Sequence, residues 1–477
     1  MSMNTGPTQS WIAGQWVESN DRFSVIDPGN GSVVAEISRA DPATCLAAVD
    51  AAAIAFASWR ESAPRARAEI LRRAFDLMTT EAETIATLIV RENGKTIVDA
   101  RNEVAYAAEF FRWFSEEAVR LDGDLRRAPG GANWIAVARQ PVGVALLLSP
   151  WNFPAAMLTR KIGPALAAGC TVVLKPAAET PLTALYLVEL LHRAGVPGGV
   201  VNLVVPDPPG PGVEAMLAHP GVRKLSFTGS TPVGKLLLTQ AARRIVNCSM
   251  ELGGNAPFVV LSDADVDAAV DGAMIAKMRN GGAACTAANR FIVDNAVADE
   301  FAEKLSARMT SLVVGYGLES ASQVGALVNT SQQSRVEGLV ERAIEMGAVV
   351  VGRGSAPNTG CFVAPIVLDH VDPTHELFAC EIFGPVAPIY RVDGEVEALR
   401  LANAVEHGLV AYVYTRDTGK GMRFSQAIEA GMVGLNRGLV SDPAAPFGGM
   451  KESGIGREGG HDGLLAFTET QYVSVSW

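Results

Sequence analysis

Apolar runs alternate with helical segments between residues 142 and 243, and this alternation constrains the fold more than any other feature. Residues 142–148 form an apolar run, which is typical of a strand buried on both faces. Residues 155–168 predict a helix that ends at Gly169. Strands and helices in this order pair in parallel, so we expect a doubly wound α/β domain. The remaining segments are strands at 171–174, 200–205 and 222–228 and helices at 181–194 and 233–243.

The rest of the chain predicts helices before this region and a second α/β domain after it. Residues 42–120 carry apolar side chains at helical spacing, which indicates several helices. After residue 251 the alternation is less regular, with a helix expected at 298–312. The strand candidates there are 257–261, 290–293, 349–351, 365–368 and 409–414. A chain of 477 residues is too long for one core, so separate domains are expected.

Two short segments interrupt this order. Residues 134–138 and 471–477 alternate apolar and polar side chains like strands, yet they lie outside both domains. Strands set apart in this way predict a small β flap for oligomerisation, although an ordinary hairpin on one domain fits the same pattern. The expected division is a first domain of residues 1–121 and 141–250, a second domain of residues 251–445, and a flap of residues 122–140 and 458–477.

Composition excludes several classes of function. The formal net charge of −11 argues against nucleic acid or an anionic membrane as a partner. Residues 1–10 are polar and lack an apolar signal segment, and no apolar run is long enough to cross a bilayer. Six scattered cysteines and six histidines, without CxxC or HExxH spacing, predict neither a disulfide framework nor a metal site. We therefore expect a soluble cytoplasmic protein with reduced thiols.

Two glycine motifs need separate interpretation. Residues 229–236, GSTPVGKL, follow a strand and open a helix as a P-loop does, but Leu236 replaces the hydroxyl that would hold Mg²⁺. An ATPase is therefore not expected. Free N–H groups at a helix start still suit a phosphate or pyrophosphate, and a plain strand-to-helix turn is the equal alternative. Residues 454–459 match GxGxxG, but too little chain follows for a βαβ unit, so we expect a glycine-rich loop.

Cys285 lies among small residues, in the segment NGGAACTAA at 280–288. Cysteine is a nucleophile as its thiolate, which is favoured in a partly exposed, electropositive setting such as a helix start. A loop of small residues that leads into a helical stretch would be such a setting, whereas the alternative is a buried structural thiol. The choice between them depends on whether the rest of the chain supplies partners for this thiol.

Two such partners are available. Asn152, in PWNFP at 150–154, follows a predicted strand and so lies at a carboxyl strand end, where ligands bind in open α/β sheets. An Asn amide there can donate a hydrogen bond to a developing oxyanion. Glu251 stands beside two glycines after another strand, and it can serve as a general base or be a solvated loop acid.

Taken in order along the chain, these pieces resemble the aldehyde dehydrogenase superfamily. The matching segments are 150–154, 175–177, 227–231, 251–254, Cys285, 381–385 and 446–451, and they cover nearly the whole chain. The resemblance implies an α/β fold of two doubly wound domains plus a β flap. It makes the first domain the nicotinamide-cofactor-binding domain, the second the catalytic domain, and the flap the contact of a homodimer or homotetramer.

The resemblance also implies a chemistry. The Cys285 thiolate would attack an aldehyde, and the Asn152 amide with the Cys285 N–H would stabilise the thiohemiacetal oxyanion. Hydride would pass to the nicotinamide, and Glu251 would activate water to hydrolyse the thioester that remains. The implied cofactor contacts are Lys175 at a ribose, Glu381 at the nicotinamide ribose, Gly229 and Ser230 at the pyrophosphate, Phe383 near the nicotinamide, and also Trp151, Ala178 and Leu252.

One departure from the family pattern concerns the cofactor. Many NAD-preferring members carry an acid at the position of Ala178, where it binds the adenosine ribose. Alanine there removes a charge that would repel a 2′-phosphate, which favours NADP. Glu179, one residue later, would restore NAD binding if the loop shifted by one residue.

The substrate is suggested by three further residues. Arg160, Arg279 and Ser441 match the carboxylate-binding residues of the succinate-semialdehyde dehydrogenase branch, and paired guanidiniums suit a carboxylate. The resemblance therefore implies oxidation of succinate semialdehyde to succinate. Structural ion pairs are the alternative for each arginine. Other readings are a dehydrogenase for glutarate semialdehyde or general aliphatic aldehydes, a non-catalytic homologue, and, weakest, a P-loop phosphotransferase.

Overall fold

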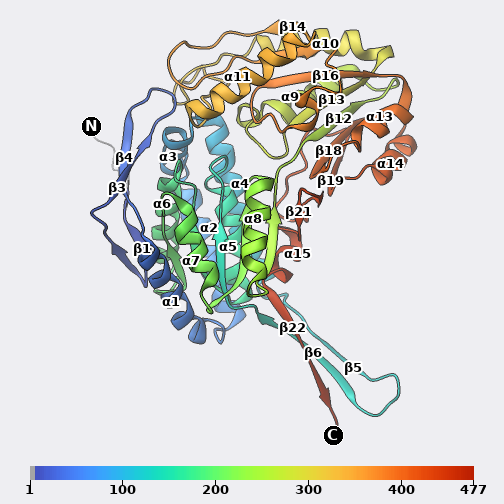
Figure 1. Cartoon of the computed structure of the whole chain (residues 1–477). Helices are drawn as coiled ribbons and strands as arrows, with labels where there is room; N and C mark the ends of the chain where they lie inside the picture. The colour runs from blue at the N-terminus through green and yellow to red at the C-terminus, as the bar shows by residue number, and fades with distance from the viewer. Residues whose placement is uncertain (1–5) are drawn as a thin grey trace.

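The computed structural model describes residues 6–477 as two large sheets with helices packed against them and a small sheet that projects from one end (Figure 1). The expected domain start at residue 1 and the first half of the polar segment 1–10 lie outside the described residues. The remaining strands form two separate two-stranded pairs.

The first sheet contains five parallel strands, as the alternation predicted. They are β7 (Val144–Leu148), β8 (Thr171–Lys175), β9 (Val201–Leu203), β10 (Val222–Thr228) and β11 (Asn247–Glu251), in the order β9-β8-β7-β10-β11. The connecting helices are α5 (Ala156–Ala168), α6 (Pro181–Arg193), α7 (Pro209–Ala218) and α8 (Thr231–Ala242). All five residues of β7 are buried, which agrees with a strand covered on both faces.

Helix ends follow the predicted signals closely. α5 ends at Gly169, whose φ of 95° is the left-handed conformation that closes a helix.

Four helices precede the first sheet: α1 (Pro42–Trp59), α2 (Pro64–Thr80), α3 (Ala82–Asn93) and α4 (Ile97–Glu117). In residues 6–477, α1 alone is long and apolar enough to cross a membrane, with a mean hydropathy of 1.4. It packs one face, which includes the buried residues Ala48, Val49 and Ala52, on β8 and α7.

The edges of the first sheet depend on strands that the sequence did not reveal. β1 (Ser10–Ile12) and β2 (Gln15–Val17) form a hairpin beside β9. The expected glycine-rich loop at 454–459 instead contains β21 (Gly454–Ile455), which pairs antiparallel with the end of β11. Gly454 has φ 143°, and a Cβ there would lie 1.9 Å from the Met250 carbonyl oxygen. Only glycine fits this close approach, so the motif serves sheet pairing.

The second sheet has seven strands in the order β14-β15-β16-β13-β12-β18-β19, parallel except at β14. Its strands are β12 (Ala256–Val260), β13 (Ala288–Asp294), β14 (Val349–Arg353), β15 (Ile366–Asp369), β16 (Val386–Val392), β18 (Val410–Tyr414) and β19 (Met432–Leu435). Among its helices are α9 (Val266–Met278), α10 (Asn295–Thr310), α11 (Thr330–Glu345), α12 (Glu376–Ala379), α13 (Gly394–Ala402) and α14 (Thr418–Ala427). β16 and β19 were not expected, whereas the parallel pairing of the other inner strands was.

The projecting sheet consists of β5 (Asp124–Arg127), β6 (Trp134–Pro141) and β22 (Thr468–Val475), with β6 in the middle (Figure 1). The segment 458–467 does not belong to it. That segment contains α15 (Gly460–Leu465), which packs on α4 and α5. Two small pairs complete the strands: β3 (Arg22–Ile26) with β4 (Val33–Ser38), and β17 (His407–Gly408) with β20 (Met450–Lys451).

Candidate active site

A cavity of about 240 Å³ opens at the carboxyl ends of the parallel strands in the first sheet, the edge where a ligand was expected. Residues after β7, at the end of β10 and after β11 line one side, and the turn that carries Cys285 lines the other. The lining residues are Pro150, Trp151, Asn152, Thr228, Gly229, Ser230, Leu252, Gly253, Cys285, Gln332, Arg335, Glu381 and Phe383. Eight of these were singled out from the sequence.

Cys285 lies in a tight turn between the single turn of 3-10 helix at Arg279–Gly282 and strand β13. The expectation that its loop leads into a helix is therefore wrong. Three consecutive positive φ angles, at 280, 281 and 282, bend the chain so that the turn faces the cavity. No helix N-terminus acts on the thiol. Its electropositive surroundings come instead from side chains elsewhere in the fold.

The Cys285 thiol is half-buried at the cavity wall. Burial raises the pKa of this thiol to about 12, and the nearby Arg160 and Arg279 guanidiniums oppose the rise. The Glu381 and Glu251 carboxyl groups add to it. In the free enzyme the thiol is therefore protonated at neutral pH, and the thiolate forms only when its proton is removed.

Asn152 presents its amide beside this turn. Its Nδ2 donates to the Ala283 carbonyl oxygen at 3.2 Å, which leaves the second proton of the same amide for an acceptor in the cavity. Within residues 6–477 no acceptor takes the Cys285 backbone N–H. Two donors therefore flank the thiol, as a tetrahedral oxyanion on an attacked carbonyl requires.

Glu251 ends β11 and is buried, and in the described part of the chain neither of its carboxylate oxygens has a hydrogen-bond partner. Burial raises the pKa of Glu251 well above its ordinary value. The Glu458 carboxylate raises it further, while the Lys161 and Arg160 cations oppose both effects. A carboxyl group with a raised pKa beside a cavity has the properties of a general base for neutral pH.

Glu458 and Lys161 are functional neighbours that sequence analysis missed. Lys161 forms an ion pair with Glu458 and also donates to the Ser226 hydroxyl at 3.0 Å. Glu458 belongs to the segment 454–459, which was interpreted as a loop. Lys161 follows Arg160, which was selected as a residue that binds the substrate carboxylate. A buried acid three residues after a strand of two residues carries no periodic signal that could have revealed it.

The start of α8 fits a pyrophosphate. Ser230 is the N-cap residue, yet its side chain makes no capping hydrogen bond, so the first-turn N–H groups face the cavity unpartnered by this cap. The buried Thr228 hydroxyl also has no partner within residues 6–477. Orphaned donors at a helix start are the environment that an anionic dinucleotide bridge requires, so the residues present fit such a cofactor.

Another part of the lining of the same cavity is aromatic and acidic, and it consists of Trp151, Phe383 and Glu381. Phe383 has φ 58°, an uncommon conformation for a bulky residue, and its ring meets Trp151 edge-on with centroids 5.3 Å apart. Glu381 accepts the Gly254 N–H at 3.3 Å, and burial raises the pKa of Glu381 to about 8. An aromatic wall beside a hydrogen-bonding acid fits a flat ring attached to a sugar.

Lys175 and Ala178 lie outside this cavity, at the end of β8 and just after it. Burial lowers the pKa of Lys175, whereas the charges of Glu179 and Asp207 raise it. Glu179 is exposed and so is available to a ligand. The Lys175 cation therefore lies in the field of two acids at the end of β8.

A second cavity, of about 220 Å³, is lined by Arg279 and Ser441 among other residues. Arg279 begins the single turn of 3-10 helix that leads into the Cys285 turn. Its other lining residues are Asp99, Asn102, Glu103, Tyr106, Phe153 and Leu439. The Arg279 guanidinium lies over the Phe153 ring at 4.8 Å. This arrangement holds a cation at the wall of a cavity, where it can bind an anionic group.

Arg160, the third residue expected here, lies behind Tyr106 and is 2% exposed. Its Nη2 donates to the Tyr106 hydroxyl at 2.7 Å, and its guanidinium lies 3.9 Å from the centre of the Phe447 ring. Its Nε and Nη1 have no hydrogen-bond partner in residues 6–477. The structure thus brings Arg279 and Ser441 to one cavity and leaves Arg160 in contact with it through Tyr106.

Comparison with known proteins agrees with this geometry. The model of the Aldehyde dehydrogenase family matches residues 16–473. The chain is 51% identical over 447 residues to a succinate-semialdehyde dehydrogenase of Paenarthrobacter nicotinovorans, over 93% of this chain and 99% of that protein. It is 43% identical over 470 residues to a glutarate-semialdehyde dehydrogenase of Pseudomonas putida, over 98% of each.

A solved structure of an NADP-dependent enzyme of E. coli is also similar, with a TM-score of 0.97 and 43% identity over 99% of each chain. The expected two-domain α/β fold is thereby confirmed. Because the family model and these relatives extend over nearly the whole sequence, the chain belongs to the aldehyde dehydrogenase family.

Proposed function

We propose that this enzyme oxidises succinate semialdehyde to succinate and uses NADP as its preferred hydride acceptor, with NAD as the alternative. The observation that carries the substrate assignment is the cavity that holds Arg279 and Ser441 beside the Cys285 turn. A cation at its wall would bind the far carboxylate of a semialdehyde while the aldehyde end reaches the thiol. The name of the relative from Paenarthrobacter nicotinovorans supports the same substrate.

The first step of the reaction is addition of the Cys285 sulfur to the aldehyde carbon. The thiol gives its proton to solvent water, the carbon–sulfur bond forms, and the carbonyl oxygen becomes an oxyanion. The free proton of the Asn152 amide and the Cys285 N–H donate to that oxygen. Arg160 and Arg279 favour the thiolate, because their charges lower the pKa of the thiol against the effect of burial.

The second step releases the acid. A bound nicotinamide supplies the acceptor for the hydride that leaves the substrate carbon, after which a thioester remains on Cys285. Glu251 then removes a proton from water, and the resulting hydroxide attacks the thioester. Its raised pKa lets it hold that proton at neutral pH, and the thiolate leaves with the electron pair of the carbon–sulfur bond.

Cofactor choice rests on the surroundings of Lys175. Ala178 places no charge at the position where an acid would repel a 2′-phosphate, and Lys175 offers a cation nearby. The similar E. coli structure is described as NADP-dependent, which supports the same preference. Initial rates of reduced-cofactor formation, measured with each cofactor in turn, test this assignment. A higher kcat/KM with NAD would overturn it.

The substrate test compares aldehydes that differ in charge. Arg279→Ala should lower kcat/KM for succinate semialdehyde by about 10²-fold, since a charge-assisted hydrogen bond is worth roughly 1.5–3 kcal/mol. An uncharged control, butanal, has the same chain length and should lose little. Equal losses on both aldehydes would assign Arg279 a structural role. Cys285→Ala should abolish oxidation of both while cofactor binding persists.

Glutarate semialdehyde is the second candidate substrate, because one relative at 43% identity carries that activity in its name. The two substrates differ by one methylene, and a hydrophobic pocket discriminates one methylene by about 10–200-fold at most. Competition between the two semialdehydes, read as the ratio of their kcat/KM values, decides which is preferred.

The assembly and the compartment also belong to this proposal. The three-stranded sheet β22-β6-β5 projects from the body and ends in two exposed edge strands, which supports a flap that binds a second copy in a homodimer or homotetramer (Figure 1). All six cysteines are free thiols, which supports a reducing compartment such as the cytoplasm.

A further inference from the structure

A buried ion pair that the mechanism does not use lies against the active-site turn. Lys95 follows α3 and Glu103 lies on α4, and their side chains are 1% and 0% exposed. The Lys95 Nζ donates to Glu103 Oε2 at 2.6 Å. The other carboxylate oxygen, Oε1, accepts the N–H groups of Ala155 at 2.8 Å and Ala156 at 3.2 Å. Burying two charges is costly, so the contacts they make need an explanation.

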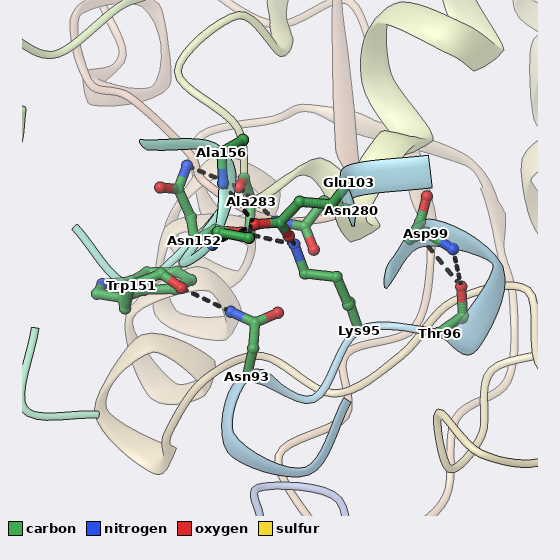
Figure 2. A network of polar contacts seen from close by, with 11 residues as sticks. Asn93, Lys95, Thr96, Asp99, Glu103, Trp151, Asn152, Ala156, Asn280 and Ala283 are labelled. Carbon is green, nitrogen blue, oxygen red and sulfur yellow. Dashed lines mark hydrogen bonds and ion pairs between the residues drawn. The ribbon is translucent and has the colours of Figure 1, made fainter. Parts of the chain in front are cut away.

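The ion pair is part of a set of side chains that hold the backbone of the Pro150–Pro154 segment (Figure 2). Asn93 donates from Nδ2 to the Trp151 carbonyl oxygen at 2.9 Å. Lys95 donates from Nζ to the next carbonyl oxygen, that of Asn152, at 2.8 Å. Gly94 lies between them with φ 94°, and this turn lets both neighbours reach the same segment. Two consecutive carbonyls are thus held from one loop.

Asn280 connects this segment to the nucleophile turn. Its Nδ2 donates at 2.9 Å to the Asn152 carbonyl oxygen and at 2.9 Å to the Ala283 carbonyl oxygen. The Asn152 amide donates to the same Ala283 oxygen. Asn280 itself adopts φ 54°, a left-handed conformation that asparagine tolerates better than most residues. One amide therefore fixes the distance between the segment that carries Asn152 and the turn that carries Cys285.

We propose that Asn280 and Lys95 are positioning residues for the oxyanion hole, which hold the Asn152 amide at the Cys285 thiol. This inference rests on the proposed roles of Asn152 and Cys285. The Asn152 carbonyl oxygen accepts one hydrogen bond from each of them, so both of its lone pairs are used and its peptide plane cannot rotate freely.

The consequence for the side chain follows from geometry. With its backbone held and one amide proton on Ala283, Asn152 has a single direction left for its second proton, into the cavity. Oxyanion donors act only when they are aligned before the charge develops. Loss of Asn280 or Lys95 would leave the donor present but free to point elsewhere, and the rate would fall without loss of the thiol.

The test is a double-mutant cycle with Asn152→Ala. Asn280→Gly removes the amide and keeps the left-handed backbone without strain. We expect Asn280→Gly alone to lower kcat/KM by about 30-fold, a fraction of the roughly 10²–10³-fold effect of removing one oxyanion donor. In the Asn152→Ala background the same change should cost at least about fivefold less, because the donor it positions is already gone.

A second variant tests the other half of the proposal. Lys95→Met with Glu103→Gln removes both charges together and keeps an oxygen for the N–H groups at the start of α5. It should also lower kcat/KM, and its effect should also shrink in the Asn152→Ala background. Equal factors in both backgrounds, for both variants, would overturn the proposal and assign the cluster to stability alone. Unchanged activity of Asn280→Gly would overturn it as well.

The matched control is Asn436→Gly. Asn436 is a second left-handed asparagine, with φ 51°, and it holds a loop by donating from Nδ2 to the Thr415 carbonyl oxygen at 2.9 Å. It contacts neither Asn152 nor Ala283, so its loss should show the same factor in both backgrounds. Thermal unfolding and cofactor affinity, measured on every variant, show how much of any loss is structural.

Two substrates separate this inference from the proposed function. Succinate semialdehyde oxidation depends on both, whereas hydrolysis of p-nitrophenyl acetate requires the thiol, the oxyanion hole and the base but neither the cofactor nor the carboxylate site. A cycle that is non-additive with the ester, in an enzyme that does not oxidise succinate semialdehyde, would refute the substrate and support the positioning role. An additive cycle with both compounds would refute the positioning role and leave the substrate standing.

Discussion

Burial shifts the pKa values of Cys285 and Glu251 more than neighbouring charges do. Cys285 and Glu251 both have raised pKa values, and in each case burial is the largest cause. Burial therefore disfavours the charged form of both groups before substrate and cofactor enter. Arg160 opposes both shifts, which makes it a common electrostatic partner of the nucleophile and the base.

Alkylation of Cys285 should reveal this resting state. Because the pKa of the Cys285 thiol is about 12, each rise of one pH unit below that value increases the thiolate fraction about tenfold. The rate constant for iodoacetamide should therefore rise about tenfold per unit from pH 7 to 10 without a plateau, as followed by mass spectrometry of the Cys285 peptide. A plateau near the ordinary thiol pKa of about 8.5 would contradict the expected burial effect.

Cofactor preference should respond to Glu179. Its charge acts on Lys175, and it is exposed beside the expected 2′ position. Glu179→Gln removes a negative charge that opposes a 2′-phosphate, at an interaction energy of about 1 kcal/mol for two charges in water. The ratio of kcat/KM with NADP to that with NAD should increase about fivefold. Glu189→Gln, at a half-buried position of α6, provides a charge-matched control and should leave the ratio unchanged.

At the scale of secondary-structure elements, the catalytic base depends on a strand of two residues. β21 completes the edge of the first sheet by pairing Gly454 with Glu251 and Ile455 with Met250. The general base therefore lies on a strand paired on both sides, which limits its backbone motion. The same stretch then carries Glu458 to the buried Lys161.

Gly454→Ala should be strongly destabilising, because the new Cβ would meet the Met250 carbonyl oxygen at 1.9 Å in a left-handed backbone. We expect a loss of more than about 3 kcal/mol in the free energy of unfolding, together with loss of activity. Gly31→Ala is the control, since Gly31 has φ 76° with no atom within 4 Å of the added Cβ. It should cost only the roughly 1–2 kcal/mol of the conformation itself. Similar costs for both variants would exclude the steric explanation.

The start of α6 offers a prediction of pH dependence. Thr180 makes no side-chain cap there, and the buried Glu92 of α3 instead accepts the N–H groups of Leu182 at 2.7 Å and Thr183 at 2.9 Å. Burial raises the pKa of Glu92 to about 8 from 4.5. The folded protein thus keeps a proton that the unfolded chain loses, so this stabilisation is complete below pH 4.5 and disappears as the pH rises to about 8.

Glu92→Gln should remove that dependence while it keeps an acceptor for α6. Between pH 5 and 8 the wild type should lose stability relative to Glu92→Gln by at most about 1.4 kcal/mol per pH unit. Denaturant unfolding at several pH values measures the difference. A stability difference that is constant across this range would show that Glu92 has the same protonation in the folded and unfolded protein.

How far the sequence predicts these elements depends on the range of the interactions that form them. Parallel strands and their helices were predicted because each is defined by local periodicity. β21 was not predicted because its partner β11 lies about 200 residues away in the chain, and the β1–β2 hairpin was not because strands of three residues are too short to show a pattern. The helix expected after Cys285 was wrong for a related reason: small residues mark a tight turn as readily as a helix start.

The same limit applies to the site residues: those marked by a local motif were predicted, and those that distant contacts bring to the site were not. Asn152, Cys285, Glu381 and Phe383 were expected from motifs and lie in one cavity. Glu458 and Lys95 carry no motif of their own, and only folding brings them to the site. Arg160, which the resemblance places at the substrate, donates to the Tyr106 hydroxyl, and no sequence signal indicates this contact with α4.

At the scale of the whole molecule, the strands of the projecting sheet β22-β6-β5 come from distant parts of the chain. β22 pairs along its whole length with β6, more than 300 residues earlier in the sequence, and β5 and β22 remain as outer edges. Leu125 and Tyr472 are 60% and 57% exposed on these strands. Exposed apolar side chains on free strand edges are typical of a surface that binds another chain.

Assembly through this flap has a direct test. Sedimentation equilibrium should give the wild type a mass of two or four chains. Leu125→Glu together with Tyr472→Glu should shift the equilibrium toward the monomer, because two charges would be buried without partners in the contact. The variant should keep its thermal unfolding transition for the body. A monomeric wild type would refute the assembly role of the flap.

The pairing of β21 with β11 also has a consequence for synthesis of the protein. β11 ends at residue 251, but its outer edge stays open until residues 454 and 455 have been added. Until then the nascent chain carries β11 as an open sheet edge, which is a template for wrong pairing between neighbouring chains. Glu251 therefore gains its second paired strand only after residues 454 and 455 have been synthesised, and a chain released before them keeps this edge open.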